Sequence, residues 1–195
     1  MGIEIILGDI CYPKSEAIII PANTLGIMSN DVQKRIIKDS FKSVSKEIEH
    51  YITNNKIEIG DCFTTNAGRL KRRGLKKIYH LVIKRLQSDF TSIYIVESSL
   101  VKVFNKLIKD KVKSVSICGI GIDAGDLDKK SVARIIVERC NKYRKVLDIK
   151  IIDDNEEFIK ECKEIANKLG IFNKEKKDVI VKPSSISVEQ DVDAN

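Results

Sequence analysis

Three short runs of apolar residues constrain the fold of this 195-residue chain more than any other feature. They are AIIIP at 17–21, KKIYHLVI at 76–83 and KSVSICGIG at 113–121. A strand that is apolar on successive positions is buried on both faces, as in a parallel sheet with helices on both sides. Segments with apolar residues at helical spacing separate these runs. This alternation predicts an α/β domain with a largely parallel sheet.

The boundaries of the elements follow from the same patterns. Gly170 is expected to end the last helix. From residue 173 no sustained apolar face remains, so we predict an α/β domain over 1–172 and a flexible tail over 173–195. The DVIV stretch of the tail leaves an added edge strand as an alternative. The predicted strands lie at 3–7, 17–21, 57–65 (with a bulge or turn at 60–61), 76–83, 113–121 and 146–152, and the predicted helices at 32–52, 90–110, 127–140 and 156–169.

Charge and cysteine usage limit the class of partner. The net charge of +7 favours anions such as nucleotides, RNA, DNA or acidic lipids, without choosing among them. The five cysteines are far apart and form no Cys-x-x-Cys pair, so we expect buried thiols in a reducing cytoplasm and no zinc site. No apolar run approaches the roughly 20 residues of a membrane span, and no signal-peptide pattern opens the chain. No metal and no cofactor are predicted.

Two loops compete as the ligand site. Ligands of open α/β sheets bind beyond the carboxyl ends of the strands. One loop follows the strand that ends at Ala22-Asn23, and the other is GIGIDAGDLDKKS at 119–131. Glycines let backbone N–H groups approach phosphate, although Gly119, Gly121 and Gly125 could equally serve turn geometry.

The order of four segments resembles the macrodomain family. They are LGDICYPKSEAIIIPAN, IEIGDCFTTNAGRL, KKIYHLVI and SVSICGIGIDAG, and the resemblance runs from about Ile3 to Leu169. NTLGIM in the first loop is similar to the Asn-x-x-Gly-x-Met of one macrodomain branch. The resemblance implies a three-layer α/β/α sandwich around a mixed, mostly parallel sheet of about six strands. It also implies binding of ADP-ribose, free or attached to a protein or nucleic acid.

The resemblance assigns roles to individual residues. Asp9 would accept a hydrogen bond from the adenine amine, because an ionised carboxylate only accepts. Ile10 would lie against the base and offer its N–H, and Asn23, after Ala22, would bind the distal ribose. The loops around the diphosphate and distal ribose would be Ser29, Asn30, Asp31 and Val32, and Gly119, Gly121, Ile122, Asp123, Ala124 and Gly125.

Each role has a plainer alternative. The sequence also departs from the family pattern in the first phosphate loop. Asp9 could be a turn residue and Asn23 could tie its own loop together. Ser29, Asn30 and Asp31 stand where the family has glycines; they could cap a helix instead. Asp31 would repel a diphosphate by a few kcal/mol at intermediate dielectric.

Further departures from the family concern adenine stacking and hydrolysis. The aromatic residue that often stacks on adenine after the last strand is absent before Phe158. Hydrolysis of ADP-ribosyl groups or ADP-ribose 1''-phosphate would depend on Asn23, with Asp31 as a candidate base. His80 reads as a core histidine and His50 as a solvated one.

A basic run supplies the alternative function. It lies at 69–77 and could be a solvated turn or a contact surface for RNA. The main hypothesis is an ADP-ribose-binding macrodomain with weak hydrolase activity; the alternative is a degenerate macrodomain that binds RNA or protein without catalysis. The basic residues concerned are Arg69, Lys71, Arg72, Arg73, Lys76 and Lys77.

Overall fold

A six-stranded mixed sheet organises the computed structural model, which describes residues 2–28, 30–40, 42–86, 89–122 and 127–171. The strand order is β1-β6-β5-β2-β4-β3, and only β3 runs antiparallel to its neighbour. The predicted fold class is therefore confirmed. The strands are β1 (Ile3–Leu7), β2 (Ala17–Asn23), β3 (Cys62–Asn66), β4 (Lys77–Lys84), β5 (Ser114–Ile117) and β6 (Asp148–Asp153).

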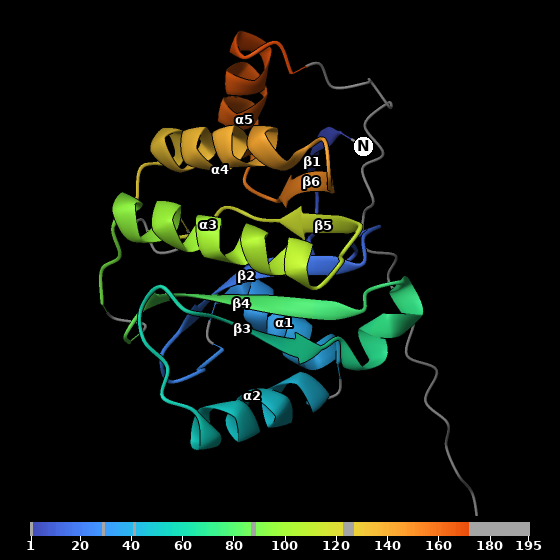
Figure 1. The fold of residues 1–195 in the computed structure, drawn as a ribbon, viewed down its shortest axis with the longest axis vertical. Coiled ribbons are helices and arrows are strands. Elements are labelled where there is room, and N and C mark those ends of the chain that lie inside the picture. The colour runs from blue at the N-terminus through green and yellow to red at the C-terminus, as the bar shows by residue number, and fades with distance from the viewer. Residues whose placement is uncertain (1, 29, 41, 87–88, 123–126, 172–195) are drawn as a thin grey trace, which may run out of the picture.

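Helices cover both faces of this sheet. Figure 1 shows α3 and α4 in front of the strands and α1 behind them, with α2 beyond β3. The opposite directions of the crossovers explain this arrangement, because right-handed connections that move in opposite directions place their helices on opposite faces. The helices are α1 (Asp31–Asp39), α2 (Ser43–Asn54), α3 (Ile93–Lys109), α4 (Lys129–Tyr143) and α5 (Glu156–Lys168), with a 3-10 helix, η1 (Gly68–Arg73).

The core is the consequence of strands that are apolar on both faces. All seven residues of β2 are buried, as are seven of the eight in β4. Helix α3 adds Val96, Leu100 and Phe104 from one stripe, each fully buried. Four of the five cysteines are buried and all are free thiols, as expected from their isolation in the sequence.

Two predicted elements were placed wrongly. The helix predicted over 32–52 is two helices, because α1 ends at Ser40 and Lys42 adopts a left-handed φ of 59° before α2. Beyond this break, α2 packs against β3 and η1 as well as against α1. The strand predicted from 57 begins at Cys62, because Gly60 and Asp61 form the turn that the sequence allowed for.

The ends of the chain add little to this picture. Gly170 has a left-handed φ of 64° directly after α5, as predicted for the residue that ends it. The predicted flexible tail and its DVIV alternative lie outside the described residues. Among the described helices, none has the length and hydropathy needed to cross a bilayer.

His80 on β4 is the one histidine inside the core. Its ring stacks on Phe63 with centroids 4.6 Å apart, and its Nε2 lies 2.9 Å from Thr65 Oγ1. Burial lowers the pKa of His80 to about 3 from an ordinary value of 6.5. The folded state therefore holds a neutral imidazole, which confirms the structural reading of this residue.

We predict that His80 makes the fold acid-sensitive. Below pH 6.5 His80 becomes protonated in the unfolded chain but stays neutral in the folded one. The free energy of unfolding therefore falls as the pH decreases toward 3. The slope from this residue reaches about 1.4 kcal/mol per pH unit. Urea unfolding between pH 7 and 4 should give a shallower dependence for His80→Phe than for the parent. Exposed His50, changed to Gln, is the control; equal slopes in the parent and His80→Phe would contradict the prediction.

Candidate functional site

The topology places a switch point at the carboxyl ends of β2 and β5. From β5 the chain crosses through α4 to β6, toward the β1 edge of the sheet. From β2 it crosses through α1 and α2 to β3, at the opposite edge. Adjacent parallel strands whose connections diverge in this way form the usual ligand site of an open α/β sheet. The two loops singled out in the sequence are the two that leave these strands.

Asp9 lies near the same edge, just beyond β1, in a small charge cluster. Its Oδ1 accepts the N–H of Cys11 at 2.8 Å, and its Oδ2 lies 3.6 Å from Arg35 Nε. Arg35, on α1, also donates from both terminal nitrogens to Asp154 Oδ2 at 3.2 Å. The guanidinium thus bridges two carboxylates, and the neighbouring charge raises the pKa of Arg35 against the opposing effect of burial. Asp9 is both a turn residue and a partly open acceptor, with 24% of its side chain exposed.

The residues next to Asp9 and at the end of β6 are more enclosed. Ile10 is only 2% exposed, so the residue as a whole belongs to the core. Asp153 accepts the N–H of Gly119 at 2.8 Å and that of Asn155 at 2.9 Å. Burial raises the pKa of the Asp153 carboxyl above its ordinary value, and these two amide bonds oppose the rise. Phe158 is fully buried, so no aromatic residue described after β6 is available to stack on a base.

Asn23 holds its own loop together. Its Oδ1 accepts the N–H groups of Leu25 and Ile27 at 3.1 Å, and its Nδ2 donates to the Ile27 carbonyl at 2.8 Å. Gly26, at the turn of this loop, has a φ of 63° and packs so closely on Ile52 of α2 that a Cβ would clash with it. The side chain of Asn23 is therefore engaged, as is usual for Asn in tight loops.

The first helix after that loop begins with a capping box. Asn30 Oδ1 accepts the N–H of Gln33 at 2.8 Å, and Gln33 Oε1 accepts the N–H of Asn30 at 3.2 Å. Asp31 is 92% exposed and lies 3.7 Å from Lys34, so solvent screens its charge more than the sequence suggested. Val32 is half-buried, and Ser29 lies outside the described residues. The capping interpretation of this segment is confirmed for Asn30.

The second loop is described at its two ends only. Gly121 has a φ of 88°, a conformation that an L-residue adopts only with strain, and Ile122 is buried beside it. Turn geometry and packing account for this glycine without any ligand. Asp123, Ala124 and Gly125 lie outside the described residues.

Lys84 is a candidate that the motif comparison missed. It ends β4 opposite Asn23, directly after a register shift between the two strands. Lys84 is only 6% exposed, although lysine is seldom buried without a specific interaction. Bulges at strand ends often redirect side chains next to functional sites. The signal in the sequence was a lysine that closes the apolar run KKIYHLVI.

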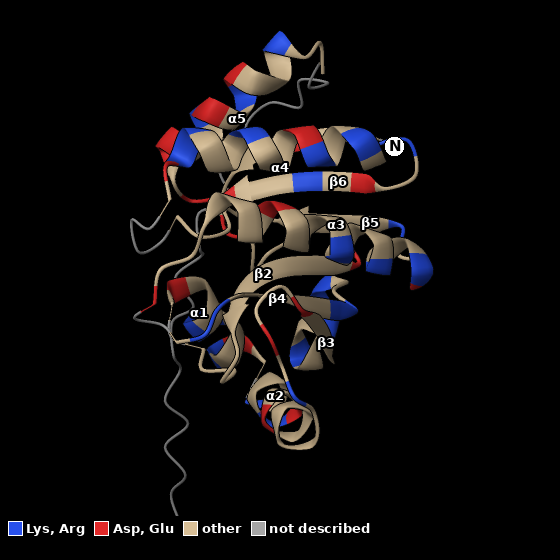
Figure 2. Ribbon diagram, turned by 60° about the vertical axis from the view of Figure 1, so that its left-hand side comes forward, with Lys and Arg blue, Asp and Glu red and all other residues tan. Residues whose placement is uncertain are grey.

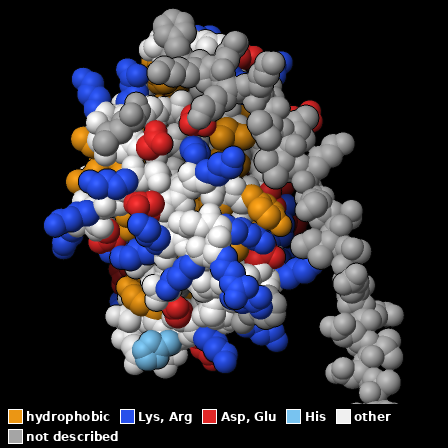
Figure 3. Space-filling model, turned by 90° about the vertical axis from the view of Figure 1, so that its right-hand side faces the viewer, with side chains coloured by type: hydrophobic (Ala, Val, Ile, Leu, Met, Phe, Trp, Pro, Cys, Tyr) orange, Lys and Arg blue, Asp and Glu red, His pale blue; other side chains and the backbone are white. Residues whose placement is uncertain are grey.

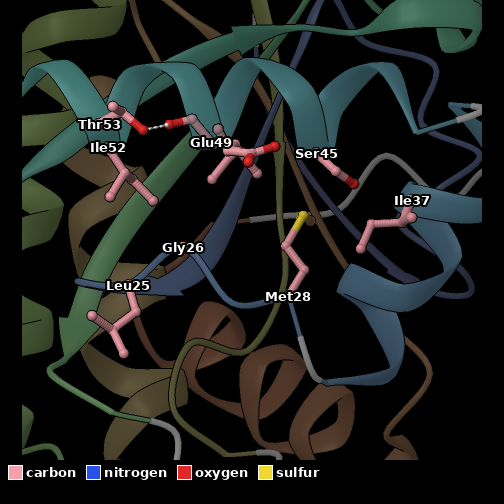
Figure 4. Close-up of a pocket in the computed structure, with 9 residues that line it drawn as sticks. Leu25, Gly26, Met28, Ile37, Ser45, Glu49, Ile52 and Thr53 are labelled. Carbon is pink, nitrogen blue, oxygen red and sulfur yellow. Dashed lines mark hydrogen bonds between the residues drawn. The ribbon is translucent and has the colours of Figure 1, made fainter.

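One pocket lies behind the first loop rather than between the two loops. It has a volume of about 240 Å³ and separates Leu25, Gly26 and Met28 from α2. Figure 4 shows Met28 and Ser45 at one end and Leu25 and Ile52 at the other. None of the residues predicted to bind the nucleotide lines this pocket. The pocket is lined instead by their neighbours Leu25, Gly26 and Met28 in the same loop. It belongs to the packing of the loop on α2.

The basic run at 69–77 lies at the opposite ends of the strands, where the parallel strands begin. It forms η1 and the start of β4, whereas the candidate ligand loops leave the other ends of the strands. Arg73 pairs with Asp39 at 2.6 Å and covers the Tyr12 ring at 4.1 Å from its centroid. Lys76 pairs with Glu16 at 2.7 Å. Most of the run is thus distant from Asp9 and Asn23. Arg73 is the exception, because it donates to the carbonyl of Cys11 at 3.1 Å, and the Cys11 N–H in turn donates to Asp9 Oδ1.

A family model for the macro domain matches residues 19–136, well over half of the chain. The chain belongs to the macro domain family. An uncharacterized protein of Aquifex aeolicus (strain VF5) is 26% identical over 161 residues, covering 82% of this chain and 94% of that protein.

Two solved macrodomains share the fold. The macrodomain of Mycobacterium tuberculosis DarG superposes with a TM-score of 0.71 and 19% identity, covering 80% of this chain and 100% of that one. A variant of the Oceanobacillus iheyensis macrodomain, solved with ADPR, gives a TM-score of 0.70 and 18% identity, covering 86% and 92%. At these identities the similarity shows the shared fold. The order of motifs noted in the sequence therefore did identify the family correctly.

We predict that Asn23 stabilises this macrodomain through its loop. Asn23→Ala removes three hydrogen bonds and leaves two backbone N–H groups to find new partners, so the free energy of unfolding should fall by about 1–3 kcal/mol. Urea unfolding measures the change. Asn55→Ala, which removes a single exposed bond to Tyr51, is the matched control. If the two variants lost the same stability, the structural role of Asn23 would be wrong.

Proposed function

We propose that the cleft between the β2 and β5 loops binds ADP-ribose, with the adenine toward Asp9. The observation that carries this proposal is a partly open carboxylate just beyond β1, at the same ends of the strands from which the divergent β2 and β5 loops leave. Membership in a family that binds ADP-ribose supports it, as does an ADPR complex of a macrodomain with the same fold.

Asp9 and Arg35 would recognise the base together. The Asp9 carboxylate lies 3.6 Å from Arg35 Nε, and a carboxylate can accept from the adenine amine but cannot donate to a keto group. The same guanidinium, with 38% of its side chain exposed, offers a planar surface beside the end of β6, after which the only described aromatic side chain, Phe158, is buried. Arginine planes stack on ring faces and are weakly hydrated. Arg35 would therefore replace the missing aromatic as the support for adenine.

The diphosphate and distal ribose would meet the other strand ends. The second loop would offer its backbone N–H groups to the diphosphate. The first of them, the N–H of Gly119, already donates to Asp153. The amino end of α1 is capped and adds partial positive charge nearby. Lys84 would supply the full positive charge on the β4 side, opposite Asn23. The distal ribose would lie toward the Asn23 loop.

Isothermal titration with ADP-ribose tests the binding proposal. The parent chain should bind, Asp9→Asn should bind about ten-fold more weakly because a charge-assisted bond is lost, and the hypoxanthine analogue should bind weakly to the parent. Arg35→Leu should weaken binding without restoring the analogue. Asp148→Asn, at the far end of β6, removes the same charge away from the cleft and is the control. No heat at millimolar ADP-ribose with a folded sample would refute the proposal.

The same cleft is proposed to hydrolyse ADP-ribosyl groups or ADP-ribose 1''-phosphate weakly. Turnover needs a base or nucleophile, and Asp31 is 92% exposed, outside the enclosed kind of environment in which such groups usually lie. Buried lysine amines serve both roles in enzymes. Lys84, at the end of β4 opposite Asn23, is therefore the residue whose removal best separates binding from turnover.

Lys84→Met is expected to reduce ADP-ribose affinity about ten-fold through the lost charge, and to reduce release of ADP-ribose from 1''-phosphate by a larger factor. Calorimetry gives the first quantity and a phosphate-release assay the second. Lys102→Met, an exposed lysine of α3, is the control. If Lys84→Met lowered affinity and turnover by the same factor, Lys84 would contribute to binding and not to hydrolysis. A parent chain that binds without turnover would show a binding module and not a hydrolase.

A further inference from the structure

The positive charge of the chain is concentrated at the edge of the sheet where the parallel strands begin. We define the basic rim as the segments that enter or leave this edge, namely 12–16, 38–40, 42, 66–77, 109–114 and 143–148. These segments hold 14 of the 35 Lys and Arg residues but only four of the 28 Asp and Glu residues. The remaining chain has 21 basic and 24 acidic residues, so the rim supplies all of the net +7.

The acidic residues of the rim lie beneath its cations. Glu16 is 29% exposed; it accepts from Lys76 Nζ at 2.7 Å and from the Lys113 N–H at 2.9 Å. The bond to Lys76 lowers the pKa of Glu16, so this carboxylate stays ionised as a support. Asp110 is 18% exposed, accepts from Tyr79 Oη at 2.7 Å and lies 3.9 Å from Lys77.

The remaining acids are Asp39, paired with Arg73 at 2.6 Å, and half-buried Asp148. The outer layer of the rim is therefore cationic. Lys76 and Lys77 remain 70% and 46% exposed above their partners. Exposed cations without an acidic partner in the described structure come from different segments, among them Lys71, Arg72, Lys111 and Lys145. Figure 3 shows this face, with Lys and Arg side chains spread across it and fewer Asp and Glu among them. Figure 2 shows the same bias at the C-terminal end of α3.

We propose that the basic rim binds the phosphodiester backbone of a nucleic acid duplex. Six strands about 4.8 Å apart give an edge of roughly 24 Å, which matches about seven successive phosphates of one strand at 3.4 Å each. A surface that reads unpaired bases would need open aromatic rings. Tyr12 is the exposed aromatic of the described rim, and its ring is covered by Arg73. The rim therefore recognises charge and spacing without reading sequence.

Most of this surface lies at the opposite ends of the strands from the proposed nucleotide cleft, about 23 Å away along the seven residues of β2. The rim approaches Asp9 only where the Tyr12 N–H donates to the Asp9 carbonyl at 3.0 Å and Arg73 donates to the Cys11 carbonyl at 3.1 Å. A duplex held by the connections at 66–72, 109–114 and 143–148 therefore leaves the Asp9 cleft open. ADP-ribose and duplex should consequently bind together without competition. The proposal extends the basic run at 69–77 to three further connections, and it does not rest on ADP-ribose binding.

Fluorescence anisotropy on the full chain tests the proposal with labelled 20-bp DNA, 20-bp RNA and a single-stranded 20-mer. Both duplexes should bind, with affinity falling steeply with salt at a slope of about 0.9 per contacted phosphate. The variant Lys71→Gln, Arg72→Gln, Lys111→Gln and Lys145→Gln should weaken duplex binding more than ten-fold and lower the slope. The two duplex arms show whether DNA or RNA binds more tightly.

A charge-matched control separates the rim from net charge. Lys34→Gln, Lys102→Gln, Lys160→Gln and Lys168→Gln remove four exposed cations elsewhere and should weaken binding less than three-fold. Equal losses in both variants, salt-independent binding, tighter binding of the single strand, or binding only to vesicles with anionic lipid would each overturn the proposal. Circular dichroism confirms that both variants fold, and excess ADP-ribose that displaces the duplex would contradict separate surfaces.

Discussion

The pairing of β2 between β4 and β5 is the constraint on which the rest of the structure depends. Every residue of β2 is buried, so both faces must be covered and both edges must be hydrogen-bonded. That requirement sends α1 to one side of the sheet and α3 to the other (Figure 1). It also makes the connections that leave β2 and β5 diverge, which puts a topological switch point at their carboxyl ends. The candidate site is thus a result of how the core is covered.

Electrostatics divides the molecule along the strand direction. The carboxyl edge carries Asp9, Asp153 and Asp154, with Arg35 as a bridge between two of them. The opposite edge carries the excess of lysine and arginine. An anionic nucleotide would approach the less favourable edge of this field and depends on local donors there, whereas a polyanion meets the favourable edge directly. This arrangement is the basis for proposing a small, selective nucleotide site at one end of the strands and a broad, unselective polyanion surface at the other.

The sequence predicted the sheet well because its strands are apolar on consecutive positions, a pattern that a surface helix does not show. The break between α1 and α2 could not be read, because Val32, Ile36, Val44 and Ile48 keep helical spacing across it. Asp9 and Asn23 were found through motifs. Their partners were not, because Arg35 and Lys84 come from other segments and meet them only in the folded chain. Asn30 was correctly offered as a cap, since its chemistry is local.

The sequence by itself determined the fold class, the family and the capping of α1, because these depend on periodicity, on motif order and on contacts between near neighbours. The tertiary structure alone decided which charges face each other. It placed Arg35 between Asp9 and Asp154, engaged Asn23 within its own loop and buried Lys84 opposite it. It also gathered lysines from separate connections onto one edge. Such arrangements depend on strand order and register, which pairings distant along the chain establish.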